Sequence, residues 1–168
     1  MIRPPGPSVK EIVVTVADWA ADVGPVDLVT LGLGSCVAIM LYDKDTRAGA
    51  MAHVLLPSRS LARDATNPAK FPETAVPLLV QRLTQLGADP RRVVAKLAGG
   101  ASMFANIMTP GSIQMGERNV VASRNALRAA AIPITAEAVG GGVGRSVRFH
   151  LTDGRAEIRT VGTDAGVI

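Results

Sequence analysis

Cysteine is nearly absent from this sequence, since Cys36 is the only one among 168 residues. One cysteine cannot close a disulfide within the chain, so the composition predicts a protein of a reducing compartment. Aromatic residues make up only 3% of the sequence, and we therefore expect a core packed from Ala, Val, Leu, Ile and Met. So few aromatic side chains also leave almost no platform on which bases could stack, which counts against a nucleic-acid-binding protein.

Long hydrophobic runs, leader-like segments and dense basic runs are missing as well. The longest uncharged apolar stretch, residues 28–42, falls short of the roughly 18 residues that suggest a membrane span, and glycines interrupt it. Residues 1–7 are rich in proline and lack the apolar core of a signal peptide. We expect a cytoplasmic protein without membrane insertion. The net charge of +4 comes with scattered basic residues, and it fits an acidic protein partner at least as well as nucleic acid.

The order of the expected elements indicates one α+β domain over residues 1–168, with a mixed β-sheet, two main helices and an irregular lead-in at residues 1–8. Apolar spacing predicts helices at residues 72–86 and 117–131. Apolar and β-branched runs predict strands at residues 11–16, 28–31, 37–42, 50–56, 93–97, 132–139, 146–151 and 156–161. Turns are expected at residues 43–46 and Asp153-Gly154, and an aperiodic surface loop at residues 57–71.

Cys36 and His53 are the two residues that indicate chemistry, because a sulfur nucleophile and an imidazole base are the minimum equipment for acyl transfer. If residues 37–42 and 50–56 form a hairpin around a loop at residues 43–46, Cys36 lies directly opposite His53, close enough for a thiol–imidazole hydrogen bond. A slip of one residue would instead move His53 to the other face. Both faces of residues 50–56 are apolar, so His53 should be buried, either as this base or as a core histidine that a backbone carbonyl satisfies.

Glycines surround the cysteine in the segment Thr30-Leu31-Gly32-Leu33-Gly34-Ser35-Cys36. A tight turn at Gly34-Ser35-Cys36 can aim backbone N–H groups at one point, where they would hold an oxyanion. The alternatives are a glycine-rich bend that packs a strand corner and a cysteine that is only a small buried hydrophobe. In an extended chain Thr30 would lie roughly 20 Å from Cys36, so a triad of Thr30, Cys36 and His53 requires a fold-back at Gly32–Gly34.

Five segments, taken together and in this order, resemble one family, the chemoreceptor glutamine deamidases called CheD. The segments are Thr30-Leu31-Gly32-Leu33-Gly34-Ser35-Cys36, Gly49-Ala50-Met51-Ala52-His53-Val54-Leu55-Leu56-Pro57, Lys96-Leu97-Ala98-Gly99-Gly100-Ala101-Ser102-Met103-Phe104, Gly116-Glu117-Arg118-Asn119-Val120 and Gly140-Gly141-Gly142-Val143-Gly144-Arg145. The likeness extends from about Val29 to Val161. It implies a layered α/β sandwich similar to bacterial toxin deamidases.

The resemblance implies a cysteine hydrolase of chemotaxis adaptation that converts receptor glutamines to glutamates through a thioester. It implies Cys36 as nucleophile, His53 as base and Thr30 as the residue that orients His53. An adjacent imidazolium would lower the pKa of Cys36. Neither a metal nor a cofactor is needed for this chemistry. The implied partners are the cytoplasmic helical domain of a chemoreceptor, as substrate, and a CheC-type phosphatase.

The remaining expected substrate or oxyanion residues are Gly34, Ser35, Gly99, Gly100 and Ser102, although the two glycines at 99 and 100 could equally end a strand. Two other functions compete with hydrolysis. The first is a non-catalytic regulatory module that binds a CheC-type phosphatase. The second is an anion- or nucleotide-binding domain that uses the glycine loops, and the lack of a complete phosphate-loop motif counts against it.

Overall fold

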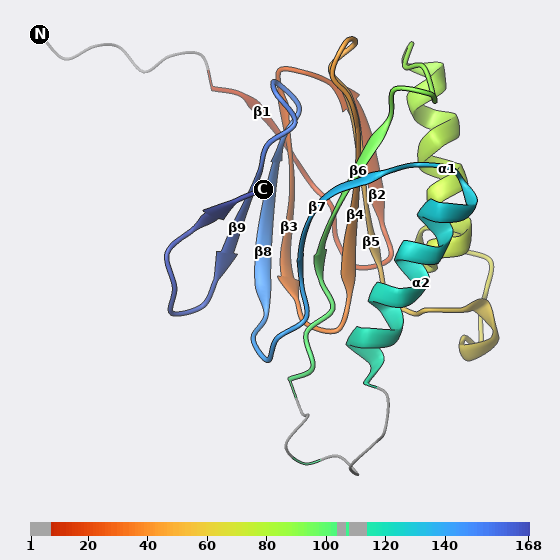
Figure 1. Cartoon of the computed structure of the whole chain (residues 1–168), viewed down its shortest axis with the longest axis vertical. Helices are drawn as coiled ribbons and strands as arrows, with labels where there is room; N and C mark the ends of the chain where they lie inside the picture. Colours follow the sequence, from red (N-terminus) through yellow and green to blue (C-terminus); the bar gives the residue numbers. More distant parts are fainter. Residues whose placement is uncertain (1–7, 104–106, 108–113) are drawn as a thin grey trace, which may run out of the picture.

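The structure, a computed structural model, describes residues 8–103, 107 and 114–168. It contains three layers, namely an outer sheet, a central sheet, and two helices that cover the far face of the central sheet (Figure 1). One apolar core lies between the two sheets and a second lies between the central sheet and the helices. The α+β class, the layered sandwich and the two main helices are confirmed, and the strands form two mixed sheets.

The outer sheet consists of β1 (Lys10–Val13), β3 (Val26–Leu33), β8 (Arg145–His150), β9 (Ala156–Thr160) and β10 (Gly166–Val167), hydrogen-bonded in that order. The central sheet consists of β2 (Trp19–Val23), β5 (Ala48–Val54), β4 (Val37–Asp43), β6 (Val94–Gly99) and β7 (Ile134–Val139), again in that order. The helices are α1 (Pro72–Gln85) and α2 (Met115–Ala129), and two short 3-10 turns are η1 (Arg59–Leu61) and η2 (Pro68–Lys70). None of the described helices is both long and apolar enough to cross a membrane.

The strands β4 and β5 are buried along their whole lengths, because the central sheet is covered on both faces. Alternate side chains of β4 divide between the two cores. The set that faces the helices is Val37, Ile39 and Leu41, whereas the set that faces the outer sheet is Ala38, Met40 and Tyr42. A strand covered on both faces needs apolar side chains at nearly every position, which explains why both strands are hydrophobic along most of their lengths.

The sequence pattern misses two strands, β2 and β10. The strand β2 reads Trp-Ala-Ala-Asp-Val, which has few β-branched residues, and it pairs on one side only, with β5. Its side chains are half-buried, so neither a buried run nor a clean alternation marks it. The strand β10 has only two residues, too few for a periodic signal.

Consecutive strands β3 and β4 lie in different sheets, so the chain passes from the outer to the central sheet between them. Residues 34–36 make this passage. The bend lies at the end of β4 away from the β4–β5 turn, as the trace shows (Figure 1). The sheet change therefore brings residues of both sheets together at one end of the core between the sheets.

Candidate functional site

The bend after β3 provides the fold-back that a site containing both Thr30 and Cys36 requires. The β3–β8 register shifts between Thr30 and Leu33, and Gly32 in this bulge has a φ of +68°, which favours glycine. A side chain at Gly34 would meet Met103, since a Cβ there would lie 3.0 Å from the Met103 sulfur. The glycines therefore allow a sharp exit from the outer sheet and a close approach of Met103.

Thr30 and His53 join the two sheets through a buried hydrogen bond. The Thr30 Oγ1 lies 2.7 Å from His53 Nδ1, and it also donates to the carbonyl of Val14 at 2.7 Å. A hydroxyl has one proton, so once it donates to Val14 it must accept from the Nδ1–H of His53. This network assigns the neutral tautomer of His53 that carries its lone pair on Nε2.

His53 is buried as expected, with only 1% of its surface exposed. Burial lowers the pKa of its imidazole, because a charged ring would lose hydration in this core. Its backbone is held from one side, since its N–H donates to the carbonyl of Asp18 and its carbonyl accepts from Ala17. The Nε2 atom has no hydrogen-bond partner among the residues that the structure describes. His53 is therefore a neutral, fixed ring with an open acceptor.

Cys36 does not lie directly opposite His53, so the expected register is wrong by two residues. Asp43 pairs with Ala48, which moves the turn from residues 43–46 to residues 44–47, and His53 pairs with Ala38. A shift by two keeps the face, because side chains alternate with a period of two. Cys36 and His53 therefore share the face toward the outer sheet as diagonal neighbours, for which separations of roughly 7–8 Å, and somewhat less between Cβ atoms, are typical. No hydrogen bond joins them within the described part of the chain.

The thiol of Cys36 lies at the margin of the core between the sheets, with 9% of the residue exposed. Burial raises the pKa of this thiol, and the smaller effect of its own backbone N–H lowers it. The lowered pKa expected from an adjacent imidazolium is therefore wrong, because burial keeps His53 neutral as well. The free protein holds a neutral thiol and a neutral imidazole.

All three carbonyls of the bend are anchored to neighbouring elements. The carbonyl of Gly34 accepts from the N–H of Ala101, and that of Cys36 accepts from the N–H of Gly100, both at 2.8 Å. The carbonyl of Ser35 accepts from the side chain of Asn119 at 2.8 Å. The N–H groups of Ser35 and Cys36, in contrast, donate to no other described residue. The bend thus fixes its acceptors and leaves two donors open next to the sulfur.

Gly99 and Gly100 support the bend through their backbones. Their φ angles are +109° and +66°, and a Cβ on Gly99 would lie 2.3 Å from the Cys36 carbonyl oxygen. The N–H of Gly100 is already used by that carbonyl. Ser102 is half-buried and donates its N–H to Gly141. It lines a hollow of about 280 Å³ beside the start of α2, next to the support rather than at the sulfur.

The sequence hardly indicates that Val14 and Asn119 contact the residues of the site. Val14 takes part through its carbonyl alone, and no side-chain pattern marks a backbone acceptor. Asn119 lies in the segment Gly116–Val120 that carries part of the family resemblance, but its contact with the bend depends on the packing of α2. Among the described residues, no group of three or more His, Cys, Asp or Glu side chains could hold a metal ion.

Together, fold and site define a layered α+β protein in which a buried threonine–histidine pair and a cysteine share the core between the sheets, near the point where the chain changes sheets. Residues 55–160 match the family described as CheD chemotactic sensory transduction. The chain therefore belongs to the CheD family, as its five segments predicted. The matched residues begin after Cys36 and His53, so the roles of these two residues rest on the site geometry.

Curated relatives match almost the whole chain. A protein from Caldanaerobacter subterraneus is 39% identical over 91% of this chain and 94% of its own length. A protein from Moorella thermoacetica is 44% identical over 95% of this chain and 96% of its own length. Each is named probable chemoreceptor glutamine deamidase CheD.

A solved structure shares the fold. It is a DUF152 protein from Neisseria meningitidis with a TM-score of 0.50 and 11% sequence identity. The match covers 80% of this chain and 65% of that protein. At this identity the likeness concerns the arrangement of strands and helices alone.

Proposed function

We propose that this chain is a protein-glutamine deamidase that acts on chemoreceptors, with Cys36 as the nucleophile and His53 as the base. The observation that carries the proposal is the buried Thr30–His53 hydrogen bond, which leaves the Nε2 acceptor open on the face that also holds the sulfur. The names of the relatives, which cover nearly the same length, supply the substrate class. The proposed place of action is the cytoplasm, where a receptor's helical domain would be the partner.

The first step is attack by sulfur on the side-chain carboxamide of a receptor glutamine. Burial disfavours a charge on either Cys36 or His53, so the proton moves from sulfur to Nε2 as the C–S bond forms. The carbonyl oxygen becomes an oxyanion, and we assign the N–H groups of Ser35 and Cys36, which donate to no other described residue, as its donors. Thr30 holds the ring in the required tautomer.

The second half of the cycle returns the enzyme to its starting state. The C–N bond breaks, and the imidazolium gives its proton to the departing ammonia, which leaves a thioester on Cys36. His53 then takes a proton from water as the water oxygen attacks the thioester carbonyl. The C–S bond breaks, sulfur regains a proton, and the products are glutamate and ammonia from glutamine and one water.

The test is incubation of the protein with the cytoplasmic fragment of a chemoreceptor, followed by peptide mass spectrometry. We expect conversion of particular glutamines to glutamates, and a loss of at least about 10⁴-fold in rate for Cys36→Ala and for His53→Ala. Both variants should stay folded, which circular dichroism checks. Receptor glutamines that stay unchanged while wild-type protein is bound would refute the enzyme and favour a module that binds a CheC-type phosphatase.

A further inference from the structure

Asn119 lies in the first turns of α2 and is completely buried. Its Nδ2 donates to the carbonyl of Ser35 at 2.8 Å and to the carbonyl of Leu55 at 3.1 Å. Ser35 precedes Cys36, and Leu55 follows His53 by two residues. One carboxamide therefore contacts both the segment that carries the sulfur and the segment that carries the imidazole.

This bridge lies where the β4–β5 ladder stops. The last pair of the ladder at this end is Val37 with Val54, so Ser35 and Leu55 lie beyond the backbone pairing. The N–H of Leu55 bonds instead to Lys70 in η2, away from β4. The Asn119 side chain therefore connects Ser35 to Leu55 just beyond the last backbone pair of the β4–β5 ladder.

The helix that presents Asn119 is itself fixed against the bend. Gly116 lies so close to the segment that follows β6 that a Cβ would be 2.4 Å from the Ala101 carbonyl oxygen and 2.6 Å from that of Gly100. Gly100 in turn donates its N–H to the carbonyl of Cys36. The first turn of α2 and the bend thus form one rigid unit, and Asn119 extends it to the end of β5.

The acceptor of the same side chain argues against a role in stability alone. Asn119 Oδ1 is buried with no hydrogen-bond partner among the described residues. Leaving a buried acceptor without a partner is unfavourable, so the residue gives up stability in order to place its two donors. Residues that lower stability in this way are expected where function sets the requirement.

We propose that Asn119 is a positioning residue that sets the separation between Cys36 and His53. The inference rests on the proposed function, since the separation matters only if the two side chains react together. It does not require contact with the substrate. Diagonal neighbours that make no hydrogen bond at rest need an external constraint to meet reproducibly, and a small misplacement of catalytic groups is costly.

The kinetic test compares Asn119→Ala and Asn119→Leu with wild type. Leucine keeps the branched shape and removes both donors, so it remains informative if alanine loosens the helix. We expect kcat to fall by about 100-fold in each variant while KM stays within about threefold. The matched control is Ser123→Ala, because Ser123 is also buried on α2 but its hydroxyl donates only to the carbonyl of Asn119 within the helix. We expect this control to keep kcat.

A second measurement needs no receptor substrate. The rate at which iodoacetamide alkylates Cys36 is followed against pH in wild type, His53→Ala and the two Asn119 variants. We expect the Asn119 variants to lose the same His53-dependent part of the profile that His53→Ala loses. Folded Asn119 variants with wild-type kcat and a wild-type profile would overturn the proposal. If wild type fails to deamidate receptors but the profiles change as expected, the positioning role stands and the proposed function falls.

Discussion

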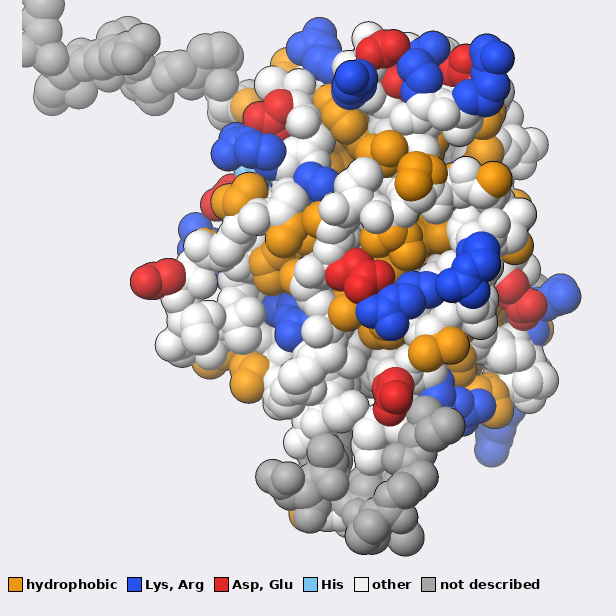
Figure 2. Space-filling model, in the orientation of Figure 1, with side chains coloured by type: hydrophobic (Ala, Val, Ile, Leu, Met, Phe, Trp, Pro, Cys, Tyr) orange, Lys and Arg blue, Asp and Glu red, His pale blue; other side chains and the backbone are white. Residues whose placement is uncertain are grey.

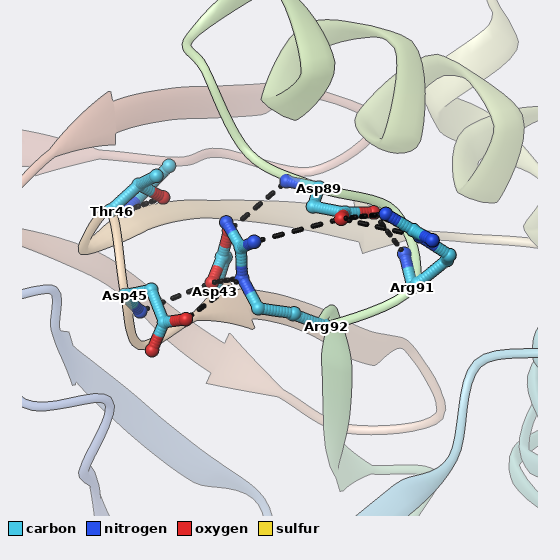
Figure 3. Close-up of polar contacts among 7 residues, drawn as sticks. Asp43, Asp45, Thr46, Asp89, Arg91 and Arg92 are labelled. Carbon is cyan, nitrogen blue, oxygen red and sulfur yellow. Dashed lines mark hydrogen bonds and ion pairs between the residues drawn. The ribbon is translucent and has the colours of Figure 1, made fainter.

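The two ends of the β4–β5 hairpin both bury polar side chains, but they treat them in opposite ways. At the turn end Asp43 is fully buried, and its carboxylate accepts from two nitrogens of Arg92 and from the N–H groups of Asp45 and Asp89 (Figure 3). At the site end His53 Nε2 and Asn119 Oδ1 are buried and accept nothing from the described residues. The same two strands thus connect a satisfied polar cluster with an unsatisfied one.

We call the turn-end cluster the Asp43 clasp, which consists of Asp43, Asp45, Asp89, Arg91 and Arg92. Positive and negative side chains alternate at the end of the molecule that carries the β4–β5 turn (Figure 2). The guanidinium of Arg92 is the main reason that the pKa of Asp43 is lowered to about 2, and the N–H groups of Asp89 and Asp45 add to it. Each oxygen of Asp43 accepts two hydrogen bonds, so this buried carboxylate is fully satisfied.

This difference in hydrogen bonding between the two ends of the hairpin suggests that one end supports the stability of the fold and the other serves its function. A buried polar group with every partner in place supports the fold, whereas one that lacks a partner lowers stability and needs another explanation. The clasp fits the first case. The site fits the second, and the proposed function explains its imidazole acceptor and two N–H groups as the receivers of a proton and of an oxyanion. Variants at the clasp should therefore change stability, and variants at the site should change turnover.

The largest effect expected at the clasp follows the loss of Arg92. Arg92→Ala leaves the buried Asp43 carboxylate without its countercharge, and we expect a large loss in the free energy of unfolding. Arg91→Ala is the matched control, because the Arg91 side chain is 89% exposed and pairs at the surface with Asp89, so the loss should be several times smaller. Urea unfolding measures both. Similar losses in the two variants, or reduced turnover by folded Arg92→Ala protein, would contradict the comparison.

The next effect is a loss of stability in acid. The folded pKa of Asp43 is about 2, below its ordinary 3.8, so its contribution is complete above the unfolded value and disappears as the pH falls through the folded value. The difference corresponds to about 2 kcal/mol, lost between about pH 4 and pH 2. Asn cannot titrate, so Asp43→Asn should start less stable and lose less over this range. If the free energy of unfolding fell by the same amount from pH 4 to pH 2 in wild type and in Asp43→Asn, Asp43 would not be the group that causes the loss.

The sequence predicts the parts of this comparison that depend on local pattern. Continuous apolar runs identify β4 and β5, because the central sheet is buried on both faces. The apolar surroundings of His53 predict its burial, and the glycines before Cys36 predict a bend. The expected register is wrong by two residues because the charge of Asp43 is typical of a turn residue, whereas Arg92 and two N–H groups allow Asp43 to end the strand as a buried residue.

The sequence cannot predict the contacts that depend on packing between layers. The Val14 carbonyl that orients the Thr30 hydroxyl belongs to the chain after β1, and only the pairing of the outer sheet brings it there. Asn119 reaches Ser35 and Leu55 because Gly116 of α2 packs against the segment that directly follows β6. The opposite pKa direction of Cys36 has the same origin, since burial between two sheets is a property of the assembled layers.

The smallest effect on turnover is expected from Thr30. Its hydroxyl has a partner for its proton and for its oxygen, although it lies next to His53, whose Nε2 has no partner among the described residues. Thr30→Val keeps the volume and removes the acceptor for His53 Nδ1–H, so we expect kcat/KM to fall by an amount equivalent to about 0.5–1.5 kcal/mol, far less than for Cys36→Ala. The acid limb of the wild-type pH profile should lie below the ordinary histidine pKa of 6.5, because burial lowers the pKa of His53 and turnover needs the neutral ring. Thr30 is neutral and cannot offset the imidazolium charge, so the limb in Thr30→Val should stay below 6.5. A loss equal to that of Cys36→Ala would instead show that the hydroxyl takes a direct part in proton transfer.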